Sequence, residues 1–360
     1  MTDQKTRSIV IVAIIFLIVL FGCLQQAGNE ISKEKAKEKS GEKDKVNENE
    51  DMTPLPEIGS QTETESQTTT ETKPPTEFNP KSFGNPNPRS VQPHPEQCCN
   101  HPYYHYIVSA GSDNGLNWQE DSIDTVIRDH ASVPDYAILD DGTHMLYFVD
   151  GVYDTLGCME SKDGKTFVEV ECRIYNFTKE KVWDPNVVSI GNSTYRLFFF
   201  SPEFEPGMGQ PNGFDQPKNR IFSAISKNGK DWLMESGVRY EDISITDPSV
   251  IKRTDGTWYM FVSHGNTIIQ AESSDGLTFK RLQEINTIGG VPDVTQINGK
   301  YYLFTCANGI SYSISDNLVD WSKLKNAIKP WGGGVICDPT VEKTNEGYMM
   351  FLKRMGMNKQ

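Results

Sequence analysis

The heptapeptide Ser-Ser-Asp-Gly-Leu-Thr-Phe at residues 273–279 is one of five copies of the pattern Ser-x-Asp/Asn-Gly-x-x-Trp/Phe. The other copies occupy residues 112–118, 161–167, 226–232 and 315–321, and the last has Leu318 in place of the glycine. Asp-Gly and Asn-Gly pairs supply the positive φ that a tight hairpin needs. The Ser and Asp/Asn side chains can accept hydrogen bonds from amides of the same turn. We therefore interpret the pattern as a marker of the fold rather than as a binding site.

A second series, an aspartate beside a proline, alternates with the first. Its members are Pro134-Asp135, Asp184-Pro185, Asp247-Pro248, Pro292-Asp293 and Asp338-Pro339. Two interleaved series of five, spaced by roughly 50 residues, indicate a repeated supersecondary unit. Radial repetition of a four-stranded unit gives a β-propeller.

The unit that begins at Asp247 shows the expected layout. Strands are predicted at 249–253, 257–263, 267–272 and 280–283, separated by turns. Three further units begin at Asp135, Asp184 and Asp293 and are also continuous. The fifth unit is split, because residues 338–352 supply only two inner strands and residues 106–127 must supply the outer two. The sequence therefore predicts an all-β, five-bladed propeller whose last blade is closed by N-terminal and C-terminal strands, which leaves no free sheet edge at the junction.

The first 23 residues have the features of an export signal. A basic start is followed by an apolar run at 9–21 and by Leu-Phe-Gly-Cys at 20–23. This tetrad resembles a lipobox, which predicts that Cys23 is lipidated. The alternative is an uncleaved membrane anchor, but the run is shorter than the roughly 20 residues that span a bilayer. Either way, we expect a protein tethered at the extracytoplasmic face of the cell membrane.

Residues 24–97 are polar and of low complexity, so they bury too little apolar surface to offset the entropy of ordering. We interpret them as a disordered linker that holds a folded domain, residues 98–356, away from the membrane. The net charge of −14 makes nucleic acid an unsuitable partner. We expect the domain to be a monomer.

Four cysteines of the folded domain suggest two disulfides, which exported proteins commonly contain. Cys158 and Cys172 flank one repeated turn and can bridge neighbouring strands. Cys306 ends a second strand and Cys337 begins the next repeat, so these two can meet on one face of the propeller.

The five aspartates beside the prolines begin the innermost strands, which line the central channel of a propeller. Their carboxylates should therefore converge around one opening. Two interpretations remain: the aspartates shape the strand entry by accepting backbone hydrogen bonds, or some of them bind a ligand. Clustered carboxylates raise one another's pKa, which suits acid–base chemistry. No cofactor is expected, although oxygen ligands of this kind can hold Ca²⁺ in the channel.

Residues 104–354 resemble the five-bladed propeller glycosidases, the clan of invertases, arabinanases and xylosidases. The resemblance lies in the Asp-Pro strand starts, the repeated turns, and Asp-Gly-x-x-x-Tyr/Met-Phe hairpins such as residues 255–261. It implies that Asp135, at the first-blade position, acts as base or nucleophile. It also implies that Asp184 and Asp247 support the transition state or tune the acid.

The chain departs from that clan at the general acid, a Glu in the third or fourth blade. Asp247 and Asp293 occupy those places here, and Glu203, in the long connection 202–219, is our hypothesis for a replacement. Expected substrate-binding residues on the rim are Asp293, Asp338, His264, Arg354 and His130. The converging carboxylates favour a glycosidase-like enzyme acting on a glycan. The missing Glu favours a non-catalytic module that binds carbohydrate or protein, and a purely structural surface protein is a third hypothesis.

Overall fold

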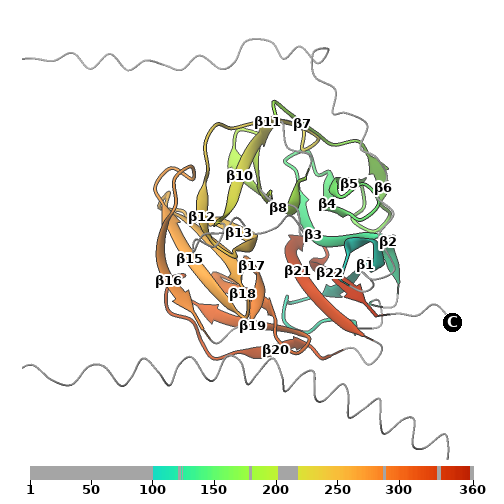
Figure 1. Cartoon of the computed structure of the whole chain (residues 1–360). Helices are drawn as coiled ribbons and strands as arrows, with labels where there is room; N and C mark the ends of the chain where they lie inside the picture. Colours follow the sequence, from blue (N-terminus) through green and yellow to red (C-terminus); the bar gives the residue numbers. More distant parts are fainter. Residues whose placement is uncertain are drawn as a thin grey trace, which may run out of the picture. The chain divides into compact units, whose positions relative to one another are not determined.

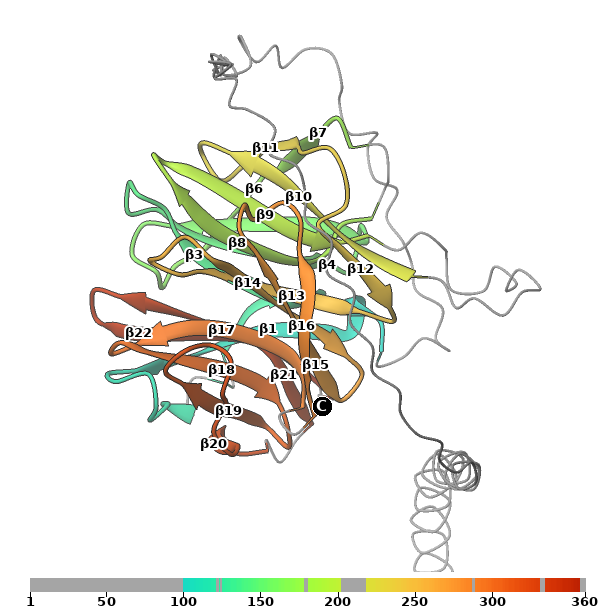
Figure 2. The same cartoon turned by 90° about the vertical axis from the view of Figure 1, so that its left-hand side faces the viewer.

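The computed structural model describes residues 100–120, 123, 125–177, 181–201, 218–286, 289–330 and 334–356. Its strands form five sheets arranged around a common centre (Figure 1). Both views place β7 and β11 at one extreme of the domain and β20 at the other (Figure 2). The expected five-bladed, all-β propeller is confirmed. None of the described segments forms a helix with the length and hydropathy needed to span a bilayer.

Three blades are continuous in the chain and contain four antiparallel strands each. The first comprises β3 (Ala131–Ile138), β4 (His144–Asp150), β5 (Thr155–Ser161) and β6 (Val168–Val170). The third comprises β13 (Thr246–Lys252), β14 (Trp258–His264), β15 (Thr267–Ser273) and β16 (Lys280–Ile285). The fourth comprises β17 (Gly290–Ile297), β18 (Lys300–Cys306), β19 (Ile310–Ser315) and β20 (Lys325–Ile328). In each blade the first strand is the innermost.

The second blade is larger than the sequence pattern predicts. Its four regular strands are β8 (Trp183–Gly191), β9 (Thr194–Phe200), β10 (Lys218–Ser226) and β11 (Asp231–Met234). Two short strands extend it: β7 (Arg173–Tyr175) pairs with β11 in parallel, and β12 (Tyr240–Ile243) pairs with β10. The connection between β9 and β10, which contains Glu203, lies outside the described residues.

The fifth blade combines the two ends of the folded domain. Its strand order is β2 (Val126–Asp129), β1 (His105–Ser112), β22 (Gly347–Met355) and β21 (Val335–Thr344). Figure 1 shows the teal N-terminal strands beside the red C-terminal ones. Strand β1 pairs with β22 over eight positions, from His105 opposite Met355 to Ser112 opposite Tyr348. The short 3-10 helix η2 (Pro102–Tyr104) then packs against β3 and β4 of the first blade.

Ending the chain at Glu346 should abolish cooperative folding of the propeller. This truncation removes β22, the only strand that joins β1 to β21, together with the fully buried side chains of Met350, Phe351 and Leu352. Thermal unfolding followed by near-ultraviolet circular dichroism checks this, with a chain ending at Gly356 as the control that keeps β22. A truncated protein that melts like this control would contradict closure of the ring by β22.

The five repeated turns join the third and fourth strands of the blades, and their side chains satisfy the turn backbone. In each, the Ser hydroxyl accepts a hydrogen bond from the N–H three residues later, and the Asp or Asn accepts two more. Leu318 takes the place of the glycine with φ 66°. The turns therefore serve the fold, as interpreted from the sequence.

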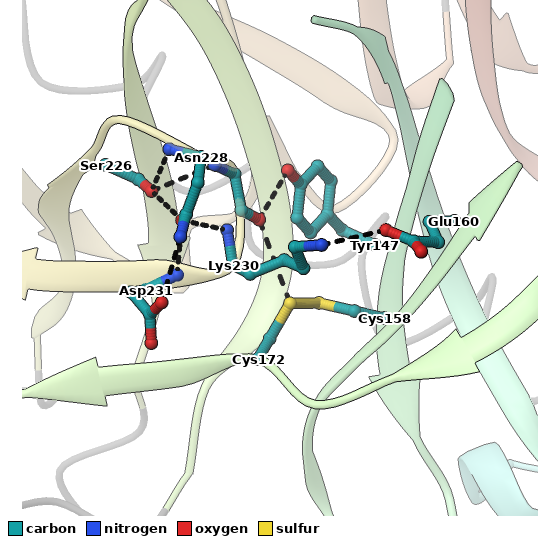
Figure 3. The surroundings of a disulfide bond; sticks show 9 residues. Tyr147, Cys158, Glu160, Cys172, Ser226, Asn228, Lys230 and Asp231 are labelled. Carbon is teal, nitrogen blue, oxygen red and sulfur yellow. Dashed lines mark hydrogen bonds and ion pairs between the residues drawn. A yellow bond between two sulfur atoms is a disulfide. The ribbon is translucent and has the colours of Figure 1, made fainter. Parts of the chain in front are cut away.

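The turn at residues 226–232 also links two blades (Figure 3). Its Gly229 carbonyl accepts a hydrogen bond of 2.8 Å from the hydroxyl of Tyr147 in the first blade. Its Trp232 is fully buried, with ring centroids 5.8 Å from Tyr147. Lys230 forms an ion pair of 2.9 Å with Glu160. The repeated turn of one blade thus anchors that blade to the blade before it.

The structure places Cys158 and Cys172 in a disulfide beside this turn (Figure 3). Cys158 belongs to β5 of the first blade, and Cys172 directly precedes β7, which extends the second. The Cα atoms are 6.0 Å apart. The crosslink therefore fastens the first blade to the second, on a strand two places outward from the inner strand β3.

Candidate functional site

The five inner strands contact one another in a closed circle, β3–β8–β13–β17–β21 and back to β3. The residue before the proline has a positive φ in every blade, between 46° and 55°. These residues are Val133, Asp184, Asp247, Val291 and Asp338. Side chains of this kind rarely adopt left-handed backbone conformations, which cost of order 1 kcal/mol or more and concentrate at functional positions. This shared conformation defines the rim positions of the channel.

All five predicted aspartates line the same small central cavity, which has a volume of about 20 Å³. They do so at two levels, because three precede their proline and two follow it. In every blade the residue before the proline and the residue after it both line this cavity. Asp184, Asp247 and Asp338 are therefore rim residues. Asp135 and Asp293 lie one step deeper, where the rim residue of their own blade is Val133 or Val291.

The residues that follow the prolines form a circle of hydrogen bonds. Each accepts a bond from a backbone N–H of the next blade: Asp135 from Val187 at 2.8 Å, Asn186 from Val250 at 2.9 Å, Ser249 from Val294 at 2.9 Å, Asp293 from Val341 at 3.0 Å, and Thr340 from Tyr136 at 3.1 Å. Asp135 accepts a second bond of 3.0 Å from the Asn186 amide. The two deeper aspartates thus join neighbouring blades. A catalytic role for Asp135 stays a prediction, and this geometry favours the structural interpretation.

Burial dominates the ionisation of these deeper carboxyls. It raises the pKa of Asp135 to about 7, against the lowering effect of the two hydrogen bonds. It raises the pKa of Glu342 to about 7 as well, and that of Asp293 well above its ordinary value, with the Asp135 charge adding to both. The native protein therefore holds protons here that the unfolded chain releases near pH 4.

Replacing Asp135 with Ala should destabilise the propeller by about 2–5 kcal/mol, since two buried donors lose their acceptor. Ser249→Ala breaks one bond of the same circle and should cost about half as much. Because the native pKa of Asp135 is raised, its contribution is full at low pH and is lost as the pH rises through about 7. Urea unfolding between pH 4 and 8 should show a steeper fall in wild-type stability than in Asp135→Ala. Equal slopes would contradict this account.

The rim carboxylates surround a lysine. The Lys353 ammonium lies 2.6 Å from an Asp338 oxygen, and its side chain is only 15% exposed. Asp184, 8% exposed, accepts a hydrogen bond of 3.2 Å from the backbone N–H of Asp247. The side-chain carboxylate of Asp247 accepts a hydrogen bond of 2.6 Å from the Thr246 hydroxyl. Four strands from three blades thus bring three acids and one base together.

Burial and mutual charge separate the proton affinities of this cluster. Burial, followed by the Asp247 charge, raises the pKa of Asp184 well above its ordinary range. Burial and the Asp338 charge raise the pKa of Asp247 to about 6. Burial acts to lower the pKa of Lys353, but the charge and hydrogen bond of Asp338 outweigh it and raise the value. The site therefore contains a Lys353–Asp338 ion pair beside two carboxyls, Asp184 and Asp247, whose pKa values are both raised.

The sequence predicts Arg354 as a rim residue that binds substrate, but the basic side chain beside the rim carboxylates is that of Lys353. Successive residues of β22 point to opposite sides, so only one of the two can reach the channel. Arg354 is 2% exposed, donates a bond of 2.6 Å to the Ile123 carbonyl and lies over the Tyr106 ring. Arg354 does not line the central cavity, and its role in substrate binding stays a prediction. The pairing of Lys353 with Cys337 in the adjacent strand was the missing information.

Among the described residues, His264 and His130 do not line the central cavity. His264 pairs with Glu284 of β16 at 3.2 Å. His130 stacks on Tyr103 at 4.0 Å and shares a hydrogen bond of 2.6 Å with its carbonyl. The structure therefore shows these two histidines in local contacts. The predictions for Glu203 and Cys23 lie outside the described residues.

The rim does not suit the Ca²⁺ considered from the sequence. In the described part of the chain, the only three candidate ligands within 4.8 Å of one another are Cys306, Cys337 and Asp338. The two sulfurs are bonded to each other and are not ligands. The Lys353 ammonium already lies among the rim carboxylates and would repel a divalent cation.

No protein-family model matches the chain, and no curated protein matches it by sequence. The fold is similar to that of a thermostable family-43 glycoside hydrolase, at 16% identity and a TM-score of 0.47, over 64% of this chain and 90% of that one. It is similar to a family-43 β-xylosidase/α-arabinofuranosidase from a compost microbial metagenome, at 15% identity and a TM-score of 0.47, over 68% of this chain and 89% of that one. It is also similar to an α-L-arabinanase mutant of Cellvibrio cellulosa, at 14% identity and a TM-score of 0.47, over 62% of this chain and 86% of that one. At these values the likeness says nothing about activity.

Proposed function

We propose that this propeller is a glycan hydrolase whose Asp184 and Asp247 act as an acid–base pair at the mouth of the channel. The observation that carries the proposal is the hydrogen bond from the Asp247 backbone N–H to the Asp184 carboxyl, which joins two acids of raised pKa whose charges act on Lys353. Pairs of acids whose surroundings push their pKa values apart are the arrangement that general acid–base chemistry needs. The glycosidase-like sequence motifs support the choice of a glycan as substrate.

In the proposed reaction Asp184 donates its proton to the glycosidic oxygen as the bond to the anomeric carbon breaks. The Asp247 carboxylate either takes a proton from the attacking water or forms a covalent bond to the anomeric carbon. The Asp338 carboxylate supplies a fixed negative charge for the developing oxocarbenium ion, and Lys353 holds that carboxylate in place. The hydrolysis consumes one water and needs no oxidant, reductant or metal.

Non-catalytic glycan binding is the second candidate, and one observation favours it. Val133 and Val291 occupy the rim positions of the first and fourth blades, so two of five rim residues offer no polar atom beyond the backbone. An apolar rim beside carboxylates suits a sugar that is held without being cleaved. Turnover decides between the two candidates.

The proposal includes the place of the protein in the cell. We propose that Cys23 carries a lipid, that residues 24–97 form a linker, and that the propeller works on a surface or environmental glycan. The export pattern at residues 1–23 and the polar composition of residues 24–97 support this. Metabolic labelling with a radioactive fatty acid checks it: label lost in Cys23→Ala supports the anchor, and label retained contradicts it.

The substrate screen uses the full-length protein and a panel of aryl glycosides and plant or bacterial oligosaccharides. Released sugar is measured by chromatography, and binding is measured in parallel by calorimetry. Hydrolysis of at least one glycoside supports the enzyme. Binding of a glycan without turnover by the folded protein would replace the enzyme with the binding module. Neither binding nor turnover would reject both candidates.

A further inference from the structure

The second disulfide, Cys306–Cys337, lies at the rim of the channel. Cys306 ends β18 in the fourth blade, and Cys337 lies in β21 of the fifth blade, directly before Asp338. The Cα atoms are 5.1 Å apart. Cys337 is the register partner of Lys353, and the Asp338 backbone N–H donates a bond of 3.1 Å to the Cys306 sulfur. The disulfide is therefore linked to both residues of the ion pair: Cys337 lies opposite Lys353 in the strand pairing, and Cys306 accepts the bond from Asp338.

The blade next to it shows the same contact without a disulfide. In the third blade, the Ser263 hydroxyl accepts a bond of 3.2 Å from the backbone N–H of Val291, the rim residue of the fourth. Cys306 occupies the matching position near the end of its own second strand. The fifth blade thus differs from the fourth in that the acceptor for the N–H of its rim residue, Asp338, is a sulfur of a disulfide.

We propose that the Cys306–Cys337 disulfide positions the Asp338 carboxylate on Lys353, and thereby keeps the lysine from pairing with Asp184 and Asp247. The proposal rests on the proposed function for its catalytic meaning. The charged groups acting on Lys353 are Asp338 of β21, Asp247 of β13 and Asp184 of β8. The flanking strands β3 and β17 present only Val133 and Val291 at the rim.

Breaking the disulfide has a defined electrostatic consequence. Cys337 is then no longer tied to β18, and the Asp338 backbone N–H loses an acceptor held at a fixed position, so the segment that carries the Asp338 carboxylate is held less firmly. Its carboxylate then moves away from Asp247, and Lys353 turns toward the two remaining acids. Both changes lower the pKa of Asp247, since the Asp338 charge raises it and Lys353 lowers it. The two effects add rather than cancel.

The test is a ¹³C NMR titration of the aspartate side chains in the full-length protein. Three proteins are compared: wild type, C306A/C337A, and C158A/C172A, which lacks the distant disulfide. We expect an Asp247 midpoint near pH 6 in the first and third, and a midpoint lower by about 1 unit in C306A/C337A. An unchanged midpoint in C306A/C337A, or an equal shift in C158A/C172A, would overturn the proposal.

Two further measurements complete the test. The first applies if C306A/C337A fails to fold, and the second asks whether the hydrogen bond to position 306 is enough without the disulfide. Treating C158A/C172A with a phosphine reduces Cys306–Cys337 to two thiols, and the same downward shift is expected. C306S/C337S keeps a hydroxyl acceptor like that of Ser263, and should shift as C306A/C337A does. No shift in C306S/C337S would assign the effect to the hydrogen bond instead of the disulfide. These readouts need no turnover, so failure of the proposed hydrolysis leaves them intact.

Discussion

Lys353→Met is expected to lower the free energy of unfolding by about 3–5 kcal/mol at pH 7.5. The substitution keeps the length and most of the apolar stem of the side chain, and removes only the ammonium. Asp338, which is 2% exposed, then has no cation 2.6 Å away to offset its lost hydration. Removing one partner of a buried ion pair costs far more than removing an exposed one.

The pH dependence separates this charge effect from a packing effect. At pH 4.5 the rim carboxyls of the variant take up protons, so the loss of stability should shrink to about 1–2 kcal/mol. Urea unfolding at the two pH values measures both numbers. Lys343→Met is the matched control, because Lys343 is an exposed lysine of the adjacent strand. A loss of stability in Lys353→Met that is equal at both pH values would show that the ammonium is not the cause.

Asp184→Asn is expected to lower kcat by 10²–10⁴, the range that a positioned acid or base contributes. The amide matches the carboxyl in shape but cannot donate an acidic proton to a leaving oxygen. It retains an oxygen that accepts the 3.2 Å bond from the Asp247 N–H, so the fold is preserved. Asp247→Asn should cause a loss of similar size. Steady-state kinetics on the glycoside found by the substrate screen measures both.

Asp255→Asn is the control for these substitutions, because Asp255 is exposed in a hairpin turn of the third blade. Its activity should equal that of the wild type. The wild-type rate should rise with pH as Asp247 ionises near pH 6, and should fall at higher pH as Asp184 loses its proton. If Asp184→Asn retained full activity while remaining folded, Asp184 would not be the acid.

The sequence was sufficient for the architecture because each blade carries its own local signals. The turn at 273–279 and the Asp247-Pro248 pair each fix a strand end within a few residues, and five repeats make the pattern unambiguous. The split of the fifth blade could be predicted by counting strands, since only two strands follow Asp338 before the chain ends. The additions of β7 and β12 to the second blade carry no comparable signal, because short strands depend on the neighbours they pair with.

The candidate site was only partly predictable, for two physical reasons. The side of the proline on which an aspartate lies shifts its carboxylate by two positions along the channel, and the sequence series mixed both kinds. Asp135 was consequently grouped with Asp184, although it lies in the deeper circle of hydrogen bonds. Lys353 gave no signal because its neighbours, Asp338 and Cys337, are distant in the chain and meet it only through strand pairing.

A ¹³C titration of Asp184 and Asp247 in the wild-type protein between pH 3 and 9 tests the central claim most directly, because it counts the protons at the rim without requiring a substrate. We predict two separate steps, with Asp247 ionising near pH 6 and Asp184 at a higher pH. Two carboxyls that both ionise below about pH 4.5, as exposed aspartates do, would contradict the acid–base site.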